Sequence, residues 1–329
     1  MSELRQDLVS GDWIILAPER AARPNVKEKK HIRRPTPKSK CPFEDLEKSG
    51  NWPPIDAYPN RNNWRIVLIP NKYPALKHVA GCASLRIYGP HRLKTGAGDH
   101  ELVVMRDHKT NFPFLKPLEA VKIFQMLQKR FKTLSRDSCN VYTSIFYNWG
   151  TLAGASLYHP HFQVLTLPII PPDVEHSLRG SARYFKKYHR CVHCAMLKFD
   201  FEEKRRIIEE NRHAVALAPY VSRSPYEVRI FPKRHLSRFE KMPAAELKGV
   251  VSVLQSSLRR IKKYLNDPDF NFFIHTAPLK DHHYNYYHWH IEIIPHISNL
   301  GGFELSTGVE IDVVDPADAA RILRGRKVY

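Results

Sequence analysis

Residues 154–168 read GASLYHPHFQVLTLP, in which a loop of small residues leads into His159 and His161 and then into an apolar stretch typical of a β-strand. The same His-x-His pattern returns as YHWHIEII at residues 287–294. Upstream of each, the chain carries the same motifs in the same order: a cysteine motif, a strand-like run that ends near a histidine, a loop with proline and a helix. This order indicates an internal duplication, so the fold is expected to contain two related units.

The two repeats match motif by motif. The first has CPFE at Cys41 followed by His108, and the second has CVHC at Cys191 followed by His235. A helix is predicted after each histidine from apolar residues spaced close to 3.6 apart. These stripes are Val121, Phe124, Leu127, Phe131 and Leu134 in the first repeat, and Leu247, Val250, Val251, Leu254, Leu258, Ile261 and Leu265 in the second. The proline-rich stretch LPIIPPDVEHS at 167–177 predicts a boundary between domains 1–170 and 171–329.

The composition indicates a globular protein. With 329 residues and 43% hydrophobic content, the chain is long enough to form two cores. Its first residues lack the basic and apolar regions of a leader, and no apolar run has the length of a membrane span. We therefore expect a cytoplasmic protein without a membrane partner. Five cysteines, an odd number, argue against a disulfide framework and favour free thiols or metal ligands.

The net charge of +19 suggests an anionic partner, either nucleic acid or a phosphorylated metabolite, or else simply a basic proteome. The densest basic run is KEKKHIRRPTPKSK at 27–40. Because it has no periodicity and no interleaved aromatic residues, we expect a solvated loop and regard nucleic-acid binding as disfavoured.

The second repeat offers the donor set of a structural zinc site. Two thiolates and two imidazoles form a closed tetrahedral set: Cys191, Cys194, His235 and His288. The alternative is a pair of buried cysteines near unrelated histidines, and the repeated order of motifs favours zinc.

The first repeat offers a related set with a carboxylate in place of one thiol, namely Cys41, Glu44, His108 and His159. Carboxylates also bind zinc, so this set predicts a second zinc site. Alternatively, Glu44 is a surface residue and the site holds no metal. The sequence leaves both interpretations open.

Side chains two apart on a strand share a face, so His159, His161 and Gln163 point the same way. If His159 is fixed by a metal or by the backbone, His161 keeps a neutral nitrogen that can act as a nucleophile, and Gln163 supplies an uncharged amide. These groups suit attack on phosphorus and transfer to a hydroxyl or phosphate better than hydrolysis. The alternative is histidines that only satisfy hydrogen bonds. The small residues at 154–156, however, allow a bulky anion to come close.

Together these motifs resemble the histidine triad superfamily, specifically its galactose-1-phosphate uridylyltransferase branch. The resemblance extends over nearly the whole chain through GDWIILAPERAARP, IPNKYPAL, GDHELVVMRDH, GASLYHPHFQ, IHTAP, YHWHIEIIPH and GGFELSTGVEID. It implies an α+β fold of two tandem histidine-triad-like units, each an antiparallel sheet with flanking helices, of which only the first is catalytic.

The resemblance also implies a reaction. His161 would attack the α-phosphorus of UDP-glucose, release glucose 1-phosphate and pass the uridylyl group to galactose 1-phosphate, while Gln163 would hydrogen-bond a phosphoryl oxygen. Because the family's arginines reach the neighbouring subunit, a homodimer is implied. The implied substrate contacts are Asn148, Gly154 and Ser156 at the phosphates, Asn71 near the nucleotide, Arg20 and Arg23 at a phosphate, and Glu304 at the hexose hydroxyls.

Several departures and alternatives accompany this assignment. His290 and Glu292 stand where the first repeat has His161 and Gln163, so no second active site is expected, and Glu292 is expected near substrate or metal. Trp149 and Phe162 are bulky residues beside the reactive loop, expected either to narrow the pocket or to reshape the base site. Three other functions compete: an ADP-sugar or dinucleotide phosphorylase with an adenylyl-histidine, a non-catalytic nucleotide- or RNA-binding protein, and a nucleotide hydrolase, which the uncharged amide disfavours.

Overall fold

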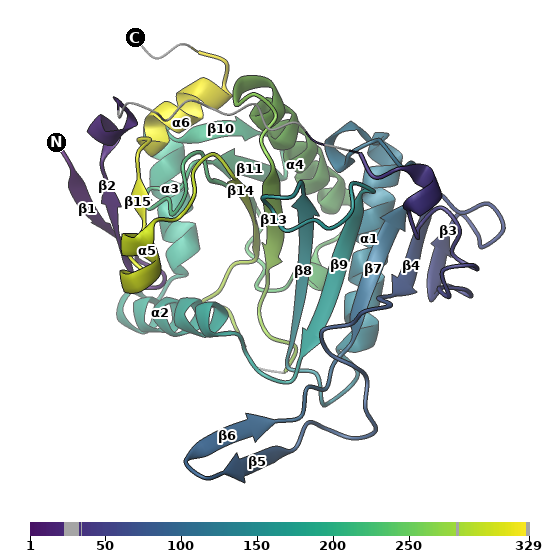
Figure 1. The fold of residues 1–329 in the computed structure, drawn as a ribbon. Helices are drawn as coiled ribbons and strands as arrows, with labels where there is room; N and C mark the ends of the chain where they lie inside the picture. The colour runs from purple at the N-terminus through teal and green to yellow at the C-terminus, as the bar shows by residue number, and fades with distance from the viewer. Residues whose placement is uncertain (23–32, 34, 281–282, 327–329) are drawn as a thin grey trace.

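The structure is a computed structural model that describes residues 1–22, 33, 35–280 and 283–326. No helix in these ranges is both long and apolar enough to cross a membrane. The centre of the molecule is a ten-stranded sheet in which every neighbouring pair is antiparallel (Figure 1). In spatial order its strands are β10 (Ile207–Glu210), β11 (Ala214–Leu217), β12 (Val228–Pro232), β14 (His290–Pro295), β13 (Phe270–His275), β8 (Tyr142–Trp149), β9 (His161–Leu167), β7 (His100–Met105), β4 (Ile66–Pro70) and β3 (Asp56–Tyr58).

The sheet consists of two five-stranded halves with the same strand order, joined where β8 pairs with β13. The predicted α+β fold with two related units is therefore confirmed, and each half is an antiparallel sheet. The two halves form one continuous sheet, because pairing β8 with β13 satisfies two strand edges that would otherwise expose unpaired backbone groups. The division into domains 1–170 and 171–329 stays a prediction. The proposed boundary falls between β9 and the next helix.

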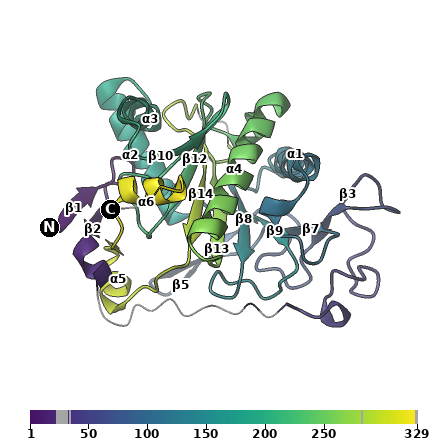
Figure 2. The same ribbon diagram turned by 90° about the horizontal axis from the view of Figure 1, so that it is seen from above.

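The two long helices predicted from the apolar stripes are confirmed as α1 (Pro117–Leu134) and α4 (Ala244–Tyr264). They lie side by side against one face of the sheet, each in its own half (Figures 1 and 2). Phe162 is fully buried on this face and contacts Phe112 and Phe124. The expectation that Phe162 narrows the pocket is therefore wrong, since its side chain points to the opposite face from those of its neighbours in β9.

The other elements are shorter or peripheral. Helix α3 packs its Leu197 against Val215 and Leu217 of β11, on the face opposite to α4. A small sheet joins the N-terminal strands to a segment near the C-terminus, with β15 parallel to β2. The remaining bounds are α2 (Pro172–Tyr188), α3 (Val192–Glu203), α5 (Gly302–Thr307), α6 (Pro316–Leu323), β1 (Glu3–Gln6), β2 (Trp13–Leu16) and β15 (Ile311–Asp312), with 3₁₀ turns η1 (Pro18–Ala22), η2 (Lys38–Lys40), η3 (Phe112–Phe114) and η4 (Phe239–Lys241).

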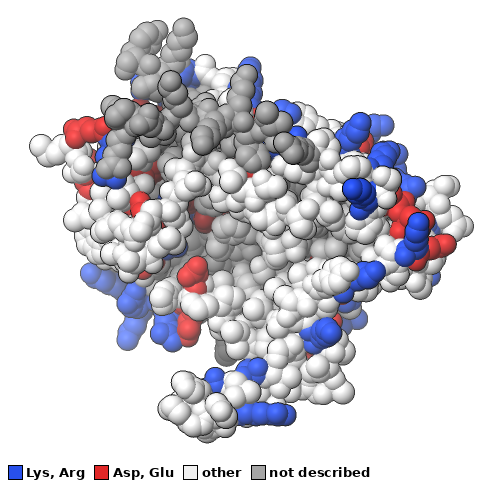
Figure 3. All heavy atoms as spheres, viewed as in Figure 1, with Lys and Arg blue, Asp and Glu red and all other residues white. Residues whose placement is uncertain are grey.

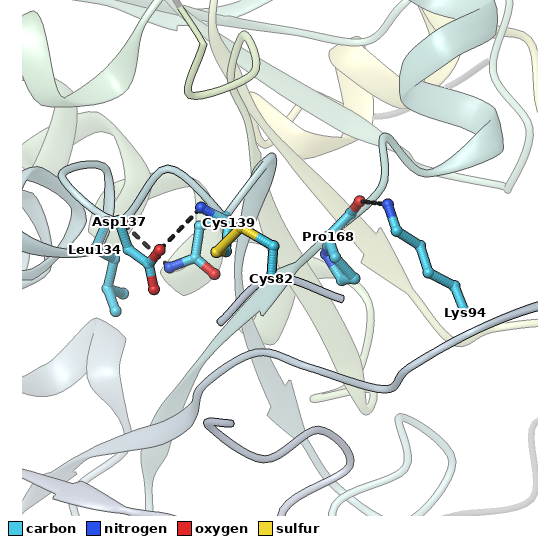
Figure 4. Close-up of a disulfide and its surroundings, with 7 residues drawn as sticks. Cys82, Lys94, Leu134, Asp137, Cys139 and Pro168 are labelled. Carbon is cyan, nitrogen blue, oxygen red and sulfur yellow. Dashed lines mark hydrogen bonds between the residues drawn. A yellow bond between two sulfur atoms is a disulfide. The ribbon is translucent and has the colours of Figure 1, made fainter. Parts of the chain in front are cut away.

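A two-stranded hairpin, β5 (Leu85–Tyr88) and β6 (His91–Lys94), projects from the body of the protein (Figure 1). A disulfide between Cys82 and Cys139 ties its base to the turn after α1, and Nζ of Lys94 donates to the carbonyl oxygen of Pro168 at 2.9 Å (Figure 4). The expectation of no disulfide was wrong for this pair. The two cysteines are 57 residues apart in sequence, and only the return of the chain through α1 brings them together. The other three cysteines are free.

Lysine and arginine side chains are scattered over the face shown in Figure 3 and do not form one continuous patch there. They lie around a central hollow whose visible atoms are mostly uncharged. Half of the basic run at 27–40 lies outside the described residues, which include residue 33 and residues 35–40 of it.

Candidate active site

His161 begins strand β9, on the sheet face opposite to α1 and α4. Its Nδ1 atom lies 2.8 Å from the backbone carbonyl oxygen of His159. Because a carbonyl only accepts, Nδ1 carries the proton and Nε2 is left with a lone pair. Burial lowers the pKa of His161, which keeps the ring neutral. The backbone thereby fixes both the tautomer and the orientation of a potential nucleophile.

Gln163, two residues along the same strand, is oriented by a histidine that sequence reasoning missed. Oε1 of Gln163 lies 2.9 Å from Nε2 of His100, while Nδ1 of His100 accepts a hydrogen bond from the backbone N–H of Ala75 at 3.1 Å. Nε2 of His100 is therefore the protonated nitrogen and donates to Gln163. Nδ2 of Asn71 lies 3.2 Å from the same nitrogen, which places Asn71 beside this pair. The amide nitrogen of Gln163 remains available as a donor.

His100 was missed because its approach to Gln163 depends on the pairing of β7 with β9. The register sets Leu102 opposite Gln163 and brings the preceding residues of β7 alongside the same strand. The motif GDHELVV contains the histidine, but nothing in one sequence gives the strand register. The alternation of side chains along β7 was the only available signal.

The loop before β9 is held by residues from the second half of the chain. Gly150 and Gly154 have φ angles of +93° and +78°, which favour glycine. A carboxylate oxygen of Asp269 accepts from the backbone N–H of Leu152 at 2.9 Å, and the other accepts from Nε of Arg33 at 2.9 Å. The loop conformation therefore depends on the join between β8 and β13.

Of the predicted phosphate contacts, Asn148 is already hydrogen-bonded across that join. Its Oδ1 accepts from Nδ2 of Asn271 at 2.8 Å, and Nδ2 of Asn271 also donates to the carbonyl oxygen of Ala153. Asn271 is the register partner of Asn148, so the duplication could have indicated it. Ser156 is exposed on the same loop. Trp149 is partly buried against the main core and packs edge-on to Tyr158.

The first metal-ligand set is brought together, with one donor atom per residue within 4.8 Å of all the others: Cys41, Glu44, His108 and His159. The Nδ1 atoms of the two histidines lie 3.1 Å apart. Their Nε2 atoms turn away and lie 2.7 Å and 2.6 Å from the carbonyl oxygens of Thr36 and Met105. Both Nε2 atoms must therefore carry the proton, so both Nδ1 lone pairs face the centre of the cluster. That arrangement suits a cation.

Glu44 faces this cluster. Its Oε1 lies 2.7 Å from Nδ1 of His108 and 3.7 Å from Nδ1 of His159. Burial lowers the pKa of His159 to about 4 and raises the pKa of the Cys41 thiol. Glu44 thus places a carboxylate oxygen beside the sulfur and nitrogen donors of the set, within reach of a shared cation.

The second set also converges within 4.8 Å: Cys191, Cys194, His235 and His288. Sγ of Cys194 lies 3.2 Å from Nδ1 of His235 and 3.5 Å from Nδ1 of His288. Hydrogen bonds from Cys194 and His235 lower the pKa of Cys191, against the opposite effect of its burial. Burial lowers the pKa of His288 to about 3, so its ring is neutral, whereas the hydrogen bond with Cys191 raises the pKa of His235. A thiolate and a neutral imidazole are forms that bind metal.

In the second half, His290 has the same backbone hydrogen bond but a covered ring. Its Nδ1 atom lies 3.0 Å from the carbonyl oxygen of His288, while Phe231 and His275 stack on the ring with centroids 4.8 Å and 4.6 Å away. Glu292 lies 3.1 Å from Nε2 of His275 and 3.4 Å from Nε of Arg229. His275, His290 and Glu292 place donor atoms within 4.8 Å of one another, but Glu292 also pairs with Arg229, whose nearer partner is Glu227 at 2.7 Å.

The remaining predicted substrate residues lie elsewhere. Arg20 and Glu304 line a cavity of about 460 Å³ together with Glu292 and His296, and neither His161 nor Gln163 lines it. The carboxylate of Glu304 also accepts from the backbone N–H of Gly301 at 3.0 Å, as part of the N-terminal cap of α5. Arg23 lies outside the described residues.

Comparison with known proteins gives a family for this geometry. A model of the N-terminal domain of galactose-1-phosphate uridyl transferase matches residues 1–171, and a model of a domain of unknown function, DUF4921, matches residues 119–326. ADP-glucose phosphorylase of Arabidopsis thaliana is 34% identical over 98% of this chain and 92% of its own length. The chain belongs to the galactose-1-phosphate uridyl transferase family.

Other members of the family align over the whole chain. Galactose-1-phosphate uridylyltransferase of Thermotoga maritima is 28% identical over 100% of this chain and 99% of its own length. The crystal structure of an ADP-glucose phosphorylase from Arabidopsis thaliana with bound ADP-glucose covers all of both chains, with a TM-score of 0.85 and 31% identity. The structure of a uridylyltransferase has a TM-score of 0.77 at 24% identity, covering 99% of this chain and 98% of its own, and shows the shared fold. Membership makes this protein an enzyme of nucleotidyl transfer on sugar phosphates.

Proposed function

We propose that this enzyme transfers the adenylyl group of ADP-glucose to inorganic phosphate through a covalent bond to Nε2 of His161. The observation that carries the proposal is the 2.8 Å contact between Nδ1 of His161 and the carbonyl oxygen of His159. It leaves Nε2 unprotonated, and it stabilises the positive charge that the ring acquires when Nε2 becomes bonded to phosphorus.

The reaction has two displacements at the same phosphorus atom. In the first, Nε2 of His161 bonds to the α-phosphorus of ADP-glucose, the bond to the bridging oxygen breaks, and glucose 1-phosphate leaves. In the second, an oxygen of inorganic phosphate bonds to the adenylyl phosphorus, the P–N bond breaks, and ADP leaves with His161 restored. The Gln163 amide donates to a phosphoryl oxygen in both steps, and an uncharged amide does not activate water.

The choice of adenine follows from similarity. The phosphorylase from Arabidopsis thaliana is 34% identical, whereas the uridylyltransferase from Thermotoga maritima is 28% identical, each over nearly the whole chain. Uridylyl transfer from UDP-glucose to galactose 1-phosphate is the second candidate, supported by the full-length match to the Thermotoga enzyme. Both candidates use the same nucleophile.

The test is to mix the protein separately with ADP-glucose and UDP-glucose, quench at mildly alkaline pH, and measure the intact mass beside a His161→Ala control. We expect an adenylyl adduct that disappears on adding phosphate. A uridylyl adduct that disappears on adding galactose 1-phosphate would select the second candidate. Tight nucleotide binding without any adduct would indicate a non-catalytic binding protein.

Zinc is the metal that fits both donor sets, because thiolate, imidazole and carboxylate ligands in fours are typical of tetrahedral zinc. A zinc ion in the first set would hold His159 in place, and with it the carbonyl oxygen that orients His161. In the second set it would bind α3 to the segment after β12, which carries His235, and to the segment before β14, which carries His288. Its chemistry in both places would be structural, and elemental analysis of the purified protein tests its presence.

A homodimer would complete the substrate site. Arg20 and Glu304 line a cavity that His161 does not line, so a second copy is proposed to bring these side chains to the first copy's nucleotide. Mixing His161→Ala with Arg20→Ala tests this, since mixed dimers would recover one intact site. Recovery of activity in the mixture supports the arrangement, and a monomer by light scattering would contradict it.

A further inference from the structure

A second cavity lies away from the nucleotide site, between α3 and the strands of the second half. Its volume is about 400 Å³, within the range of small-molecule sites. Most of its lining is apolar, from α3, β11 and β12, and includes Met196, Leu197, Leu217 and Phe231. Phe199 and Tyr220, which are 52% and 48% exposed, also line it and mark the side that opens to solvent.

Within this lining, His193 is 1% exposed, and neither of its ring nitrogens has a hydrogen-bond partner among the described residues. A buried polar group without a partner is rare in folded proteins and costs free energy. The duplication makes this residue more conspicuous. His193 follows Cys191 by two positions, just as Phe43 follows Cys41. The ring centroid of His193 lies 5.2 Å from that of His290, and the ring centroid of Phe43 lies 5.3 Å from that of His161. The first half uses a phenyl ring where the second has two unused nitrogens.

The charged residues that line this cavity are Arg190, Arg206, Arg229 and Asp200. Arg206 forms an ion pair with Asp200 at 2.5 Å, and its guanidinium lies 5.3 Å from the ring centroid of Tyr220. Arg190 also lines the cavity, is exposed, and has no ion-pair partner among the residues that the structure describes. The cavity therefore combines an apolar interior, a pair of unsatisfied nitrogens and an unpaired cation at its opening.

From these features we infer that the cavity binds a small aromatic carboxylate with a ring hydroxyl. The ring would contact Leu197 and Phe231. A hydroxyl both donates and accepts, so it can pair with one ring nitrogen of His193 in either tautomer. The carboxylate would pair with Arg190. Neither the nucleotide nor the sugar phosphate of the proposed reaction has this combination of groups.

The experiment titrates the full-length protein calorimetrically with three probes: 4-hydroxyphenylacetate, phenylacetate without the hydroxyl, and 2-(4-hydroxyphenyl)ethanol without the carboxylate. We expect 4-hydroxyphenylacetate to bind at least about tenfold more tightly than either of the others, because phenylacetate leaves the buried ring of His193 without a partner and the alcohol brings no negative charge to Arg190. Absence of saturable binding of 4-hydroxyphenylacetate in the millimolar range would overturn the inference.

Two variants assign the contacts. His193→Phe copies Phe43 of the first half and should bind 4-hydroxyphenylacetate and phenylacetate equally. Arg190→Gln, an exposed change, should remove the preference for the acid over the alcohol. If His193→Phe still prefers 4-hydroxyphenylacetate to phenylacetate, or if Arg190→Gln still prefers the acid to the alcohol, the assignment is overturned. His161→Ala should bind all three probes unchanged, and loss of binding there would place the probe in the nucleotide site, against the inference.

Discussion

At the start of β9, Nδ1 of His161 lies 2.8 Å from the carbonyl oxygen two residues earlier, and at the start of β14, Nδ1 of His290 makes the same contact at 3.0 Å. Both strands lie beside a cluster of four metal-ligand residues. What differs is the packing around the rings. His161 contacts one aromatic ring of the cysteine motif, that of Phe43, whereas His290 has Phe231 and His275 stacked on it.

The residue two positions further along completes the contrast. Gln163 is neutral and is held by His100, while Glu292 is charged and lies between Arg229 and His275. The backbone hydrogen bond and the metal cluster therefore belong to the scaffold shared by both halves. Catalytic capacity depends on which side chains are left unpaired around that scaffold.

The largest expected effect comes from removing the nucleophile. His161→Ala should abolish the covalent adduct and lower kcat by at least about a thousandfold, because it removes the nitrogen that bonds to phosphorus. His290→Phe, the matched change in the second half, keeps a ring between Phe231 and His275 and should leave adduct formation intact. Mass spectrometry and steady-state kinetics measure both, and loss of the adduct in His290→Phe would contradict the comparison.

The cysteine motif of the second half should contribute mainly to stability, and that of the first half mainly to the rate of adduct formation. Cys191→Ser should lower the free energy of unfolding by at least about 3 kcal/mol, since metal binding is coupled to folding, and should affect the rate of adduct formation less. Cys41→Ser should slow adduct formation more, because Cys41 lies 3.4 Å from Nδ1 of His159, whose carbonyl orients the nucleophile. Denaturant unfolding, bound metal and single-turnover kinetics are compared for both variants. Unchanged metal content in Cys191→Ser would refute the metal assignment.

Exchanging Gln163 and Glu292, which hold equivalent positions in the two halves, tests the role of charge. Gln163→Glu should lower kcat about a hundredfold, because a carboxylate repels phosphoryl oxygens and has no hydrogen to donate. Glu292→Gln should lower stability by about 1–3 kcal/mol, since Arg229 loses part of its charge compensation, and the adduct on His161 should still form. Kinetics and thermal unfolding separate the two effects. A loss of adduct in Glu292→Gln would mean that the second half takes part in the chemistry.

The smallest effect concerns the loop held across the join between halves. A Cβ on Gly150 would lie 1.9 Å from the carboxyl carbon of Asp269, so Gly150→Ala should be about 2 kcal/mol less stable than Gly81→Ala. Gly81 is the matched control, because its φ of +83° is similar and nothing lies within 4 Å of its added Cβ. If chemical denaturation shows that Gly150→Ala and Gly81→Ala lose the same free energy of unfolding, backbone strain alone explains the effect.

The sequence by itself determined the duplication, the two helices and the metal-ligand sets. These features depend on short-range periodicity and on residue types with few chemical uses, so they are readable before folding. The alternation along β9 also determined that His161 and Gln163 share a face.

Tertiary structure alone decided how these parts meet. Pairing of β8 with β13 brought Asn271 to Asn148 and Asp269 to the loop at 150–154, and pairing of β7 with β9 brought His100 to Gln163. The return of the chain through α1 also formed the unexpected disulfide. Strand register and packing join residues that are distant in sequence, and no local pattern encodes which unpaired group will meet which partner.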